Sequence, residues 1–272
     1  MRAWCNGTFV DAEGPAIAVL DHGFTVGDGV FEAIKVVDNA PFALTRHLDR
    51  LAFSAVGLGL PRPDDALVRE AVKAVLEGQS FVFGRIRITY TAGISPLGSG
   101  RDTTSPTLVV VVTDAKPYEP TTKAVVVPWP RNEKGAIAGL KTTSYGENVV
   151  ALAYAEKNGA SEAVFANTAG NLCEGTGTNV FCVFGDEIAT PPLSAGCLSG
   201  VTRNLVVEWC GAVERDIAMA EVAGADEVFL TSTTRDVQGL HALDERTFPA
   251  DQPVTAQVAR VWREREPQDV DP

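Results

Sequence analysis

The pattern of apolar and polar positions divides the first third of the chain into strands and helices. Residues 30–37, 81–91 and 107–113 are rich in β-branched side chains, and we expect each stretch to form a strand. Over residues 45–57 the apolar positions recur at helical spacing, and Thr45 can serve as the N-cap, so this stretch is expected to be a helix.

The rest of the chain alternates short strands with helices. The segment 114–122 carries two prolines between two predicted strands and is expected to be an interdomain linker. This division gives a small N-terminal α/β domain over residues 1–113 and a larger C-terminal domain over residues 123–272. The fold class is therefore α/β, in the mixed α+β arrangement. The other expected elements are helices at 66–76, 147–157, 198–210 and 255–265, and strands at 123–127, 162–166, 171–174, 180–184, 187–189 and 227–231.

Two segments lack a regular pattern. Residues 92–106 are rich in Gly, Ser and Pro, and a loop of this length is expected to be a lid or a binding loop. Residues 266–272 form an acidic tail, which we expect to fray.

Composition narrows the classes of partner. The chain has 272 residues and a formal net charge of −12, which argues against binding to a nucleic acid backbone. No apolar run approaches the roughly 18 to 20 residues of a membrane span, so no membrane partner is expected. The five cysteines have no CxxC spacing and only three histidines occur, so neither a disulfide framework nor a metal site is indicated. We therefore expect a cytoplasmic protein with a small-molecule partner.

Two residues stand in unusual surroundings for their charge. Lys141 lies among small and apolar residues, which favours a neutral, nucleophilic amine; the alternative is a lysine at a strand end that reaches solvent. Glu174 is flanked by Cys173 and Gly175, so it needs a cationic partner unless it faces water in a turn.

Three further patterns suit an anion. Residues 200–203 open a helix, where backbone N–H groups and the Thr202 hydroxyl could bind an anion or simply cap the helix. Residues 231–237 place hydroxyls and amides on a turn after a strand. Arg50 shares a helix face with Arg46, which could also be a surface ion-pair face. Together with a lysine amine and a carboxylate, these donors are what a pyridoxal phosphate (PLP) site requires.

Several ordered blocks of sequence strengthen this interpretation. They are Asp21-His-Gly-Phe-Thr-Val-Gly-Asp-Gly-Val-Phe-Glu, His47-Leu-Asp-Arg-Leu, Gly139-Leu-Lys-Thr-Thr-Ser-Tyr, Gly170-Asn-Leu-Cys-Glu-Gly-Thr-Gly-Thr-Asn-Val-Phe and Leu198-Ser-Gly-Val-Thr-Arg. In these blocks, which span nearly the whole chain, the sequence resembles the class IV aminotransferases, the fold-type IV PLP enzymes. That family holds D-amino acid, branched-chain and (R)-amine transaminases and 4-amino-4-deoxychorismate lyases.

The resemblance implies a two-domain enzyme with PLP between the domains. Lys141 is then the Schiff-base lysine and proton shuttle, Glu174 pairs with the pyridine nitrogen, and Tyr145 approaches the phenolic side of the ring. The residues implied for the phosphate are Arg50, Val201, Thr202, Ser232 and Thr233. The family also implies a homodimer in which loops of each subunit complete the other's site.

The segment around Phe31 resembles the D-amino acid transaminase branch, with Phe31 where that group commonly has Tyr. The Arg-x-His carboxylate trap of that group has no counterpart in residues 91–100. The substrate carboxylate is therefore assigned to Arg235, with Arg87 and Arg101 as alternatives. Lys35 is expected to line the pocket beside Phe31, because both lie on one face of a strand.

The expected reaction is transfer of an amino group from D-amino acids or (R)-amines to 2-oxo acids. The alternatives are an aminodeoxychorismate lyase, which releases pyruvate, and then a branched-chain L-amino acid aminotransferase. These reactions begin with the same proton removal at Cα and differ in side-chain placement, which no motif reports. The sequence therefore leaves open the choice between transaminase and lyase, as well as the amino donor and acceptor.

Overall fold

The computed structural model describes residues 1–102 and 105–272 and divides them into two units. The first unit comprises Met1–Pro117, Leu140–Tyr145 and Val270–Pro272, and the second comprises Tyr118–Gly139 and Gly146–Asp269. The mixed α/β fold class is confirmed.

The segment with Lys141 packs with the first unit, whereas the sequence placed it in a C-terminal domain of residues 123–272. The physical reason is backbone pairing. The Phe31 N–H donates to the Lys141 carbonyl oxygen (2.9 Å), and the Thr143 N–H donates to the Gly29 carbonyl oxygen (2.8 Å). These bonds join residues that lie far apart in the sequence, so no local pattern of apolar and polar positions could have predicted them.

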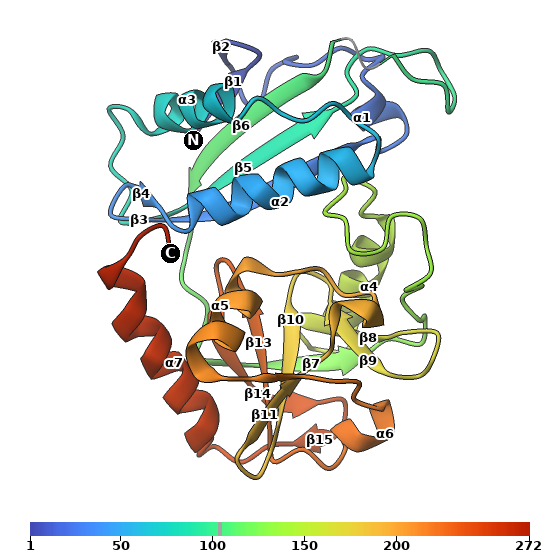
Figure 1. Cartoon of the computed structure of the whole chain (residues 1–272), viewed down its shortest axis with the longest axis vertical. Coiled ribbons are helices and arrows are strands. Elements are labelled where there is room, and N and C mark those ends of the chain that lie inside the picture. The colour runs from blue at the N-terminus through green and yellow to red at the C-terminus, as the bar shows by residue number, and fades with distance from the viewer. Residues whose placement is uncertain (103–104) are drawn as a thin grey trace. The chain divides into compact units, whose positions relative to one another are not determined.

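The first unit is built on a six-stranded antiparallel sheet in the order β2-β1-β6-β5-β3-β4. Helices α2 and α3 pack on this sheet through a shared apolar core (Figure 1). The strands are β1 (Arg2–Cys5), β2 (Thr8–Val10), β3 (Gly29–Val37), β4 (Ala40–Pro41), β5 (Phe83–Thr91) and β6 (Thr107–Asp114). The helices are α1 (His22–Thr25), α2 (Leu44–Gly57) and α3 (Asp65–Leu76).

Strand β3 presents different chemistry on its two faces. Val30, Ile34 and Val36 alternate into the core under the helices, and Glu32 stands in the same row. Phe31 lies on the opposite face. One strand therefore supplies both a buried carboxylate and an aromatic ring.

Helix α2 begins one residue earlier than the pattern predicts. Its N-cap is Ala43, in the left-handed conformation (φ 53°), and no side chain within the helix caps it. Thr45 lies inside the first turn, so its prediction as the N-cap is wrong. The tail expected to fray instead returns to this helix, where the Ala43 N–H donates to the Val270 carbonyl oxygen (2.7 Å).

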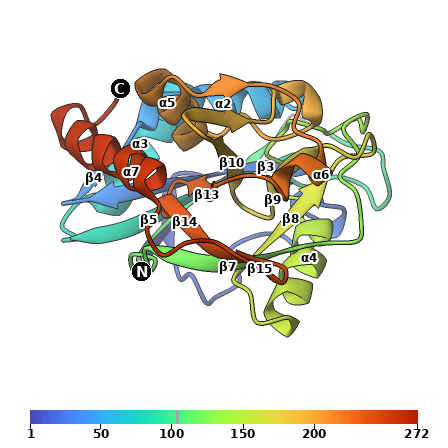
Figure 2. The same ribbon diagram turned by 90° about the horizontal axis from the view of Figure 1, so that it is seen from below.

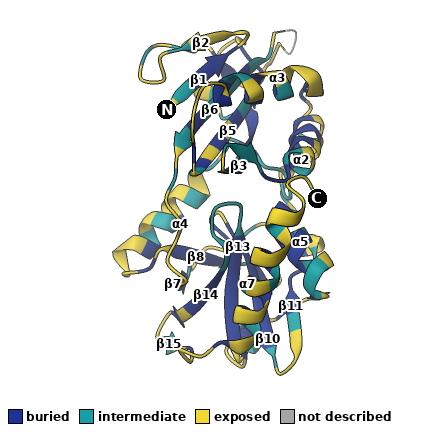
Figure 3. Cartoon of the chain, turned by 90° about the vertical axis from the view of Figure 1, so that its left-hand side faces the viewer, coloured by how far each residue is buried: buried dark blue, intermediate teal, exposed yellow. Residues whose placement is uncertain are grey.

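The second unit is built on a mixed nine-stranded sheet in the order β12-β11-β10-β13-β14-β7-β8-β9, with β15 paired to β14. Figure 3 shows that β10, β13 and β14 are largely buried. The strands are β7 (Thr121–Val126), β8 (Glu162–Ala166), β9 (Leu172–Gly175), β10 (Asn179–Phe184), β11 (Glu187–Thr190), β12 (Val213–Glu214), β13 (Glu227–Ser232), β14 (Asp236–Leu243) and β15 (Arg246–Thr247).

Helices pack on separate parts of this sheet. Helix α5 packs on β13, α7 on β13 and β14, and α4 on β8 (Figure 2). The helices are α4 (Gly146–Lys157), α5 (Val201–Cys210), α6 (Met219–Val222) and α7 (Pro253–Arg265), with short 3₁₀ turns at Leu193–Ala195 and Glu266–Gln268. The first turn of α5 lies near the end of β13, which positions one part of the candidate site.

The residues that the structure describes contain neither a membrane-spanning helix nor a cluster of metal ligands. No helix among them is both long and apolar enough to cross a membrane. Within residues 1–102 and 105–272, no group of three or more His, Cys, Asp or Glu side chains could hold a metal ion.

Candidate active site

In the first unit, Lys141 lies beside the aromatic ring of Phe31. Its backbone N–H donates to the Ser54 hydroxyl on α2 (3.1 Å), and its Nζ is 4.4 Å from the centroid of the Phe31 ring. The backbone of Lys141 is thus fixed both by β3 and by α2. A lysine held in this way presents its amine at a defined place.

Phe31 also gathers two other residues that the sequence assigned to the site. The Arg87 guanidinium lies 3.5 Å from the ring centroid, and Tyr145 meets the ring edge-on with centroids 5.1 Å apart. Arg87 comes from β5, whereas Tyr145 comes from the same segment as Lys141. The structure therefore brings Phe31, Arg87, Lys141 and Tyr145 together.

Arg87 has no acidic partner in this cluster. Its Nε–H donates weakly to the Thr89 hydroxyl (3.4 Å), and no carboxylate in the described ranges forms an ion pair with it. Burial lowers the pKa of Arg87, which means that its charged form lacks part of its solvation. An anion bound beside it would restore that stabilisation.

Lys35 shares the strand face of Phe31 but is almost fully buried. Its Nζ lies 5.4 Å from the centroid of the Phe42 ring. The cation–π contact and the burial favour a structural role for Lys35 at the far end of β3.

Arg50 is fixed by a buried carboxylate that the sequence analysis missed. Its Nε–H and Nη2–H donate to the two oxygens of Glu32 (2.8 and 2.7 Å), and His47 Nδ1 lies 2.7 Å from the same carboxylate. Glu32 is fully buried. The alternation along β3 offered a signal, because Glu32 is the one charged residue in a row of core positions.

The charges of this network are strongly coupled. Burial by itself would raise the pKa of Glu32, but Arg50 and His47 outweigh it and hold the pKa at about 2. Burial lowers the pKa of His47, so the imidazole is neutral at pH 7. Arg50 and Glu32 therefore form a charge pair with a neutral hydrogen-bonded neighbour. The pair fixes the direction of the guanidinium, whose fork offers five N–H donors in all.

In the second unit, Glu174 is held at both carboxylate oxygens. Its Oε2 accepts a hydrogen bond from the Leu198 N–H (2.8 Å), and its Oε1 lies 3.3 Å from Arg131 Nε. Arg131 lies over the Phe165 ring (4.1 Å) and donates to the side-chain oxygen Oδ1 of Asn148 (3.1 Å). Arg131 is thus the cationic partner that the sequence analysis required for Glu174 without identifying it.

The first turn of α5 carries Val201 and Thr202, and both are buried. Its N-cap is Gly200, and no side chain caps the turn. A Cβ at Gly200 would lie 2.0 Å from the Asn179 amide oxygen, so only glycine fits there. The first backbone N–H groups of a helix have no partner within the helix, so this turn could bind an anion.

Two buried hydroxyls occur in the strands around this turn. Thr178 Oγ1, just before β10, and Thr231 Oγ1, in β13, have no hydrogen-bond partner among the described residues. Thr231 pairs in register with Asn179, the residue after Thr178. Buried hydroxyls normally find a partner, so this arrangement suits a ligand that accepts hydrogen bonds.

In the turn after β13, which carries the hydroxyls of Ser232 and Thr233, the surroundings of Arg235 differ from those expected of a substrate-binding arginine. The Ser232 hydroxyl accepts from the Arg235 N–H (3.3 Å), and Thr233 lies at the half-buried tip of the hairpin. The Arg235 guanidinium contacts the Ser161 carbonyl oxygen (3.1 Å), Gln238 and the Tyr118 ring. These contacts favour a structural role for Arg235 over the carboxylate-binding role assigned from the sequence.

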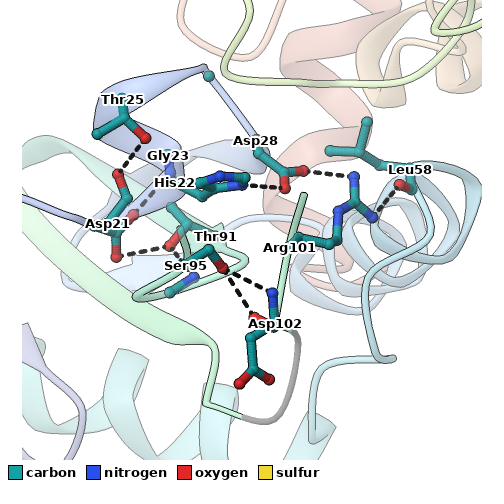
Figure 4. A network of polar contacts seen from close by, with 12 residues as sticks. Asp21, His22, Gly23, Thr25, Asp28, Leu58, Thr91, Ser95, Arg101 and Asp102 are labelled. Carbon is teal, nitrogen blue, oxygen red and sulfur yellow. Dashed lines mark hydrogen bonds and ion pairs between the residues drawn. The ribbon is translucent and has the colours of Figure 1, made fainter. Parts of the chain in front are cut away.

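Arg101, the third candidate for the substrate carboxylate, belongs to a pinned network in the first unit (Figure 4). It pairs with Asp28 (2.8 Å) and donates to the Leu58 carbonyl oxygen (2.8 Å). His22 bonds the other oxygen of Asp28 and the Pro96 carbonyl oxygen, each at 3.0 Å. The hydrogen bond to Asp28 raises the pKa of His22. Part of the segment predicted to be a lid or binding loop, 92–106, is thus bonded to Leu58 at the C-cap of α2 and to Asp28 just before β3; Thr103 and Thr104 lie outside the described residues.

Comparison with known proteins gives the class to which these groups belong. The sequence profile of the amino-transferase class IV family matches residues 29–243. A putative branched-chain-amino-acid aminotransferase of Methanocaldococcus jannaschii is 31% identical over 91% of this chain and 90% of its own. A D-alanine aminotransferase of Staphylococcus epidermidis is 29% identical over 89% of each chain. A fold IV transaminase, CpuTA1, from Curtobacterium pusillum superposes with a TM-score of 0.85 at 30% identity, covering 96% of this chain and 93% of its own.

The chain belongs to the class IV aminotransferases, as its sequence blocks and its fold both indicate. Enzymes of this class depend on PLP. The residues present fit that cofactor. Lys141 offers a primary amine, Glu174 a fixed carboxylate, and the uncapped first turn of α5 with the Thr178 and Thr231 hydroxyls a set of unsatisfied phosphate donors.

Proposed function

We propose that this protein is a transaminase that moves an amino group from D-amino acids to 2-oxo acids. The observation that carries the proposal is the cluster on Phe31, where Arg87, without an acidic partner among the described residues, and the Lys141 amine contact the same ring. The Arg87 guanidinium is suited to bind a substrate carboxylate, and the Lys141 amine is suited to remove a proton from the carbon next to that carboxylate. The similarity to D-alanine aminotransferase supports the D configuration.

Each proposed role follows from the surroundings of the residue. Lys141 would hold the cofactor through Nζ until the amine of the amino donor takes its place there, and the amine of Lys141 released in this exchange would remove the Cα proton. Glu174 would accept a hydrogen bond from the protonated ring nitrogen, because its other contacts keep the carboxylate in place. When bound, PLP supplies a ring that accepts the electron pair left on Cα.

The phosphate would be held by donors of two kinds. Arg50 contributes a charged fork in a direction set by Glu32. The backbone N–H groups of Val201 and Thr202, the hydroxyls of Thr178 and Thr231, and the turn at Ser232 and Thr233 contribute neutral donors. Tyr145 would contact the phenolic side of the ring from its place beside Phe31.

We assign the substrate carboxylate to Arg87. The side chain is attached to a rigid sheet and stacks on Phe31, so its fork is pre-organised for a bidentate contact. Arg235 and Arg101 are held instead by Gln238 and Asp28. A donor that lacks a carboxylate, such as a plain (R)-amine, would leave Arg87 without a partner and should react poorly.

A homodimer is part of the proposal. Large apolar side chains are exposed on α1 and on the loop whose Pro96 carbonyl oxygen bonds His22 of α1, notably Phe24 (70% exposed) and Leu97 (76% exposed). Exposed apolar side chains close together are typical of protein contact surfaces.

The test is a half-reaction without an acceptor. The purified yellow protein is mixed separately with D-alanine, L-leucine, (R)-1-phenylethylamine and aminodeoxychorismate while the absorbance of the bound cofactor is recorded. D-alanine should bleach the colour and release pyruvate, and Lys141→Ala should abolish both signals. Bleaching by L-leucine in place of D-alanine would establish the branched-chain L-enzyme. Pyruvate released from aminodeoxychorismate without bleaching would establish the lyase.

A further inference from the structure

The segment Val270–Pro272 supplies the cap that helix α2 lacks. Asp271 Oδ1 accepts a hydrogen bond from the Thr45 backbone N–H (2.7 Å), and its Oδ2 accepts from the Thr45 hydroxyl (2.6 Å). An N-cap side chain normally makes such a bond from within the same helix. Here the carboxylate comes from a residue 226 positions further along the chain.

Other bonds fix the same segment to the same turn. The Ala43 N–H donates to the Val270 carbonyl oxygen (2.7 Å), and Arg46 Nε–H donates to the Pro272 backbone oxygen (2.7 Å). Each residue of the segment therefore contacts the first turn of α2. The negative charge of Asp271 also lies at the positive end of the helix dipole.

Helix α2 is the element that carries His47 and Arg50 to Glu32. Arg50 follows Thr45 by five residues, about one and a half helical turns. Glu32 lies in β3 and does not move with the helix. The start of the helix therefore acts together with the Glu32 pair to set where the Arg50 guanidinium lies relative to the sheet.

We propose that Asp271 is a positioning residue for the cofactor phosphate, acting through α2 on Arg50. The inference rests on the proposed role of Arg50 at the phosphate. With the cap in place, the first turn of α2 holds Arg50 in the orientation from which its guanidinium contacts the phosphate. Without it, the first turn of α2 opens more often and the contact with the phosphate weakens.

The experiment compares PLP with pyridoxal, which lacks the phosphate. Dissociation constants for both are measured by equilibrium dialysis on the full chain, for the parent protein, Asp271→Ala and Asp251→Ala. Asp251 is an exposed aspartate in the loop before α7 and serves as the matched control. Asp271→Ala should weaken PLP binding about threefold to tenfold, the typical effect of losing a helix cap, and leave pyridoxal binding unchanged.

A second pair of variants tests the hydroxyl contact. Thr45→Val should weaken PLP binding in the same sense, and Thr45→Ser should restore it. Amide hydrogen exchange at Thr45 should become faster in Asp271→Ala and not in Asp251→Ala. If PLP and pyridoxal binding fall equally in Asp271→Ala, or if neither falls, the cap is only structural and the inference is wrong.

Arg50→Lys separates this inference from the proposed function. Lysine keeps the charge but loses the fork, so PLP binding should weaken relative to pyridoxal. If Arg50→Lys has that effect and Asp271→Ala does not, only the role of Asp271 is wrong. If Arg50→Lys leaves the ratio unchanged, the phosphate role of Arg50 fails and the inference fails with it.

Discussion

The two units hold their candidate phosphate-binding groups in opposite ways. In the first unit, the candidate phosphate residue Arg50 is already paired with the buried Glu32. In the second unit, the donors are neutral and unsatisfied, namely the uncapped turn of α5 and the Thr178 and Thr231 hydroxyls. The charged region is stabilised by its own network, whereas the neutral region keeps an unfavourable arrangement that a ligand would relieve.

For three other arginines the contrast between the units is reversed, because here the second unit has the paired side chains and the first unit has the one without an acidic partner among the described residues. Arg131 and Arg235 of the second unit have fixed partners in Glu174 and Gln238. Arg87 of the first unit stacks on Phe31 without an acidic partner among the described residues. This contrast is the reason for assigning the substrate carboxylate in our proposal to Arg87 and not to Arg235.

The largest expected effect comes from removing the charge of Glu32. Glu32→Gln leaves the buried Arg50 without its carboxylate, which should lower the free energy of unfolding by about 3–5 kcal/mol. Urea unfolding at pH 7 measures this change. A loss below about 1 kcal/mol would show that the network contributes little to stability and that the contrast between the units is not energetic.

The pH dependence of the same variant sharpens the result. The folded-state pKa of Glu32, about 2, is below its ordinary value of 4.5, so its stabilisation is complete above pH 4.5 and is lost as the pH falls towards 2. The pH-dependent contribution of Glu32 to the free energy of unfolding amounts to about 3 kcal/mol, and it should be missing in Glu32→Gln. The lowered pKa of His47 acts in the same direction, because below about pH 6.5 the unfolded chain takes up its proton first.

A smaller effect separates Arg87 from Arg235. Arg87→Ala should raise KM for D-alanine at least about tenfold, since a charged bidentate contact is lost. Arg235→Ala should change KM little while lowering the unfolding midpoint, because its contacts with Ser161 and Gln238 are structural. Steady-state kinetics together with thermal unfolding distinguish the two outcomes. The reverse pattern would return the carboxylate role to Arg235.

The smallest expected effect concerns Thr231. Replacing it with valine removes a buried hydroxyl that has no partner among the described residues, so the unfolding free energy should stay constant or rise by up to about 1 kcal/mol. PLP binding should weaken a fewfold. Thr190→Val is the matched control, because the buried Thr190 hydroxyl donates to the Val180 carbonyl oxygen (2.9 Å), and its loss should destabilise the protein. Equal stability effects in both variants would contradict an unsatisfied Thr231.

Sequence patterns predicted the elements better than their partners. The alternation of residues 30–37 and the helical spacing of residues 45–57 depend on local chemistry, and the structure confirms both elements. The family match and the PLP requirement also agree with the motifs around Lys141 and Glu174.

What could not be predicted depends on contacts between distant segments. Glu32 of β3 pairs with Arg50 of α2, and Glu174 of β9 pairs with Arg131, which lies outside the named helices and strands. The cap of α2 comes from Asp271, so the nearby Thr45 was the natural but wrong choice from local sequence. Periodicity reports which face a residue takes, but it does not report which charged group lies opposite that face.

The passage of the chain between the units has a consequence for biosynthesis. Leu140–Tyr145 and Val270–Pro272 pack with the first unit, although the second unit supplies the residues between them, Gly146–Asp269, and the stretch Tyr118–Gly139 directly before the first of them. A ribosome therefore releases the lysine-bearing segment only after it has begun the second unit, and the helix cap only after it has synthesised all of that unit. Early folding of the nascent chain can build the six-stranded sheet, but Lys141 and the cap residue Asp271 are synthesised later. For the same reason, a genetic dissection at Pro117 would yield a fragment without its reactive amine.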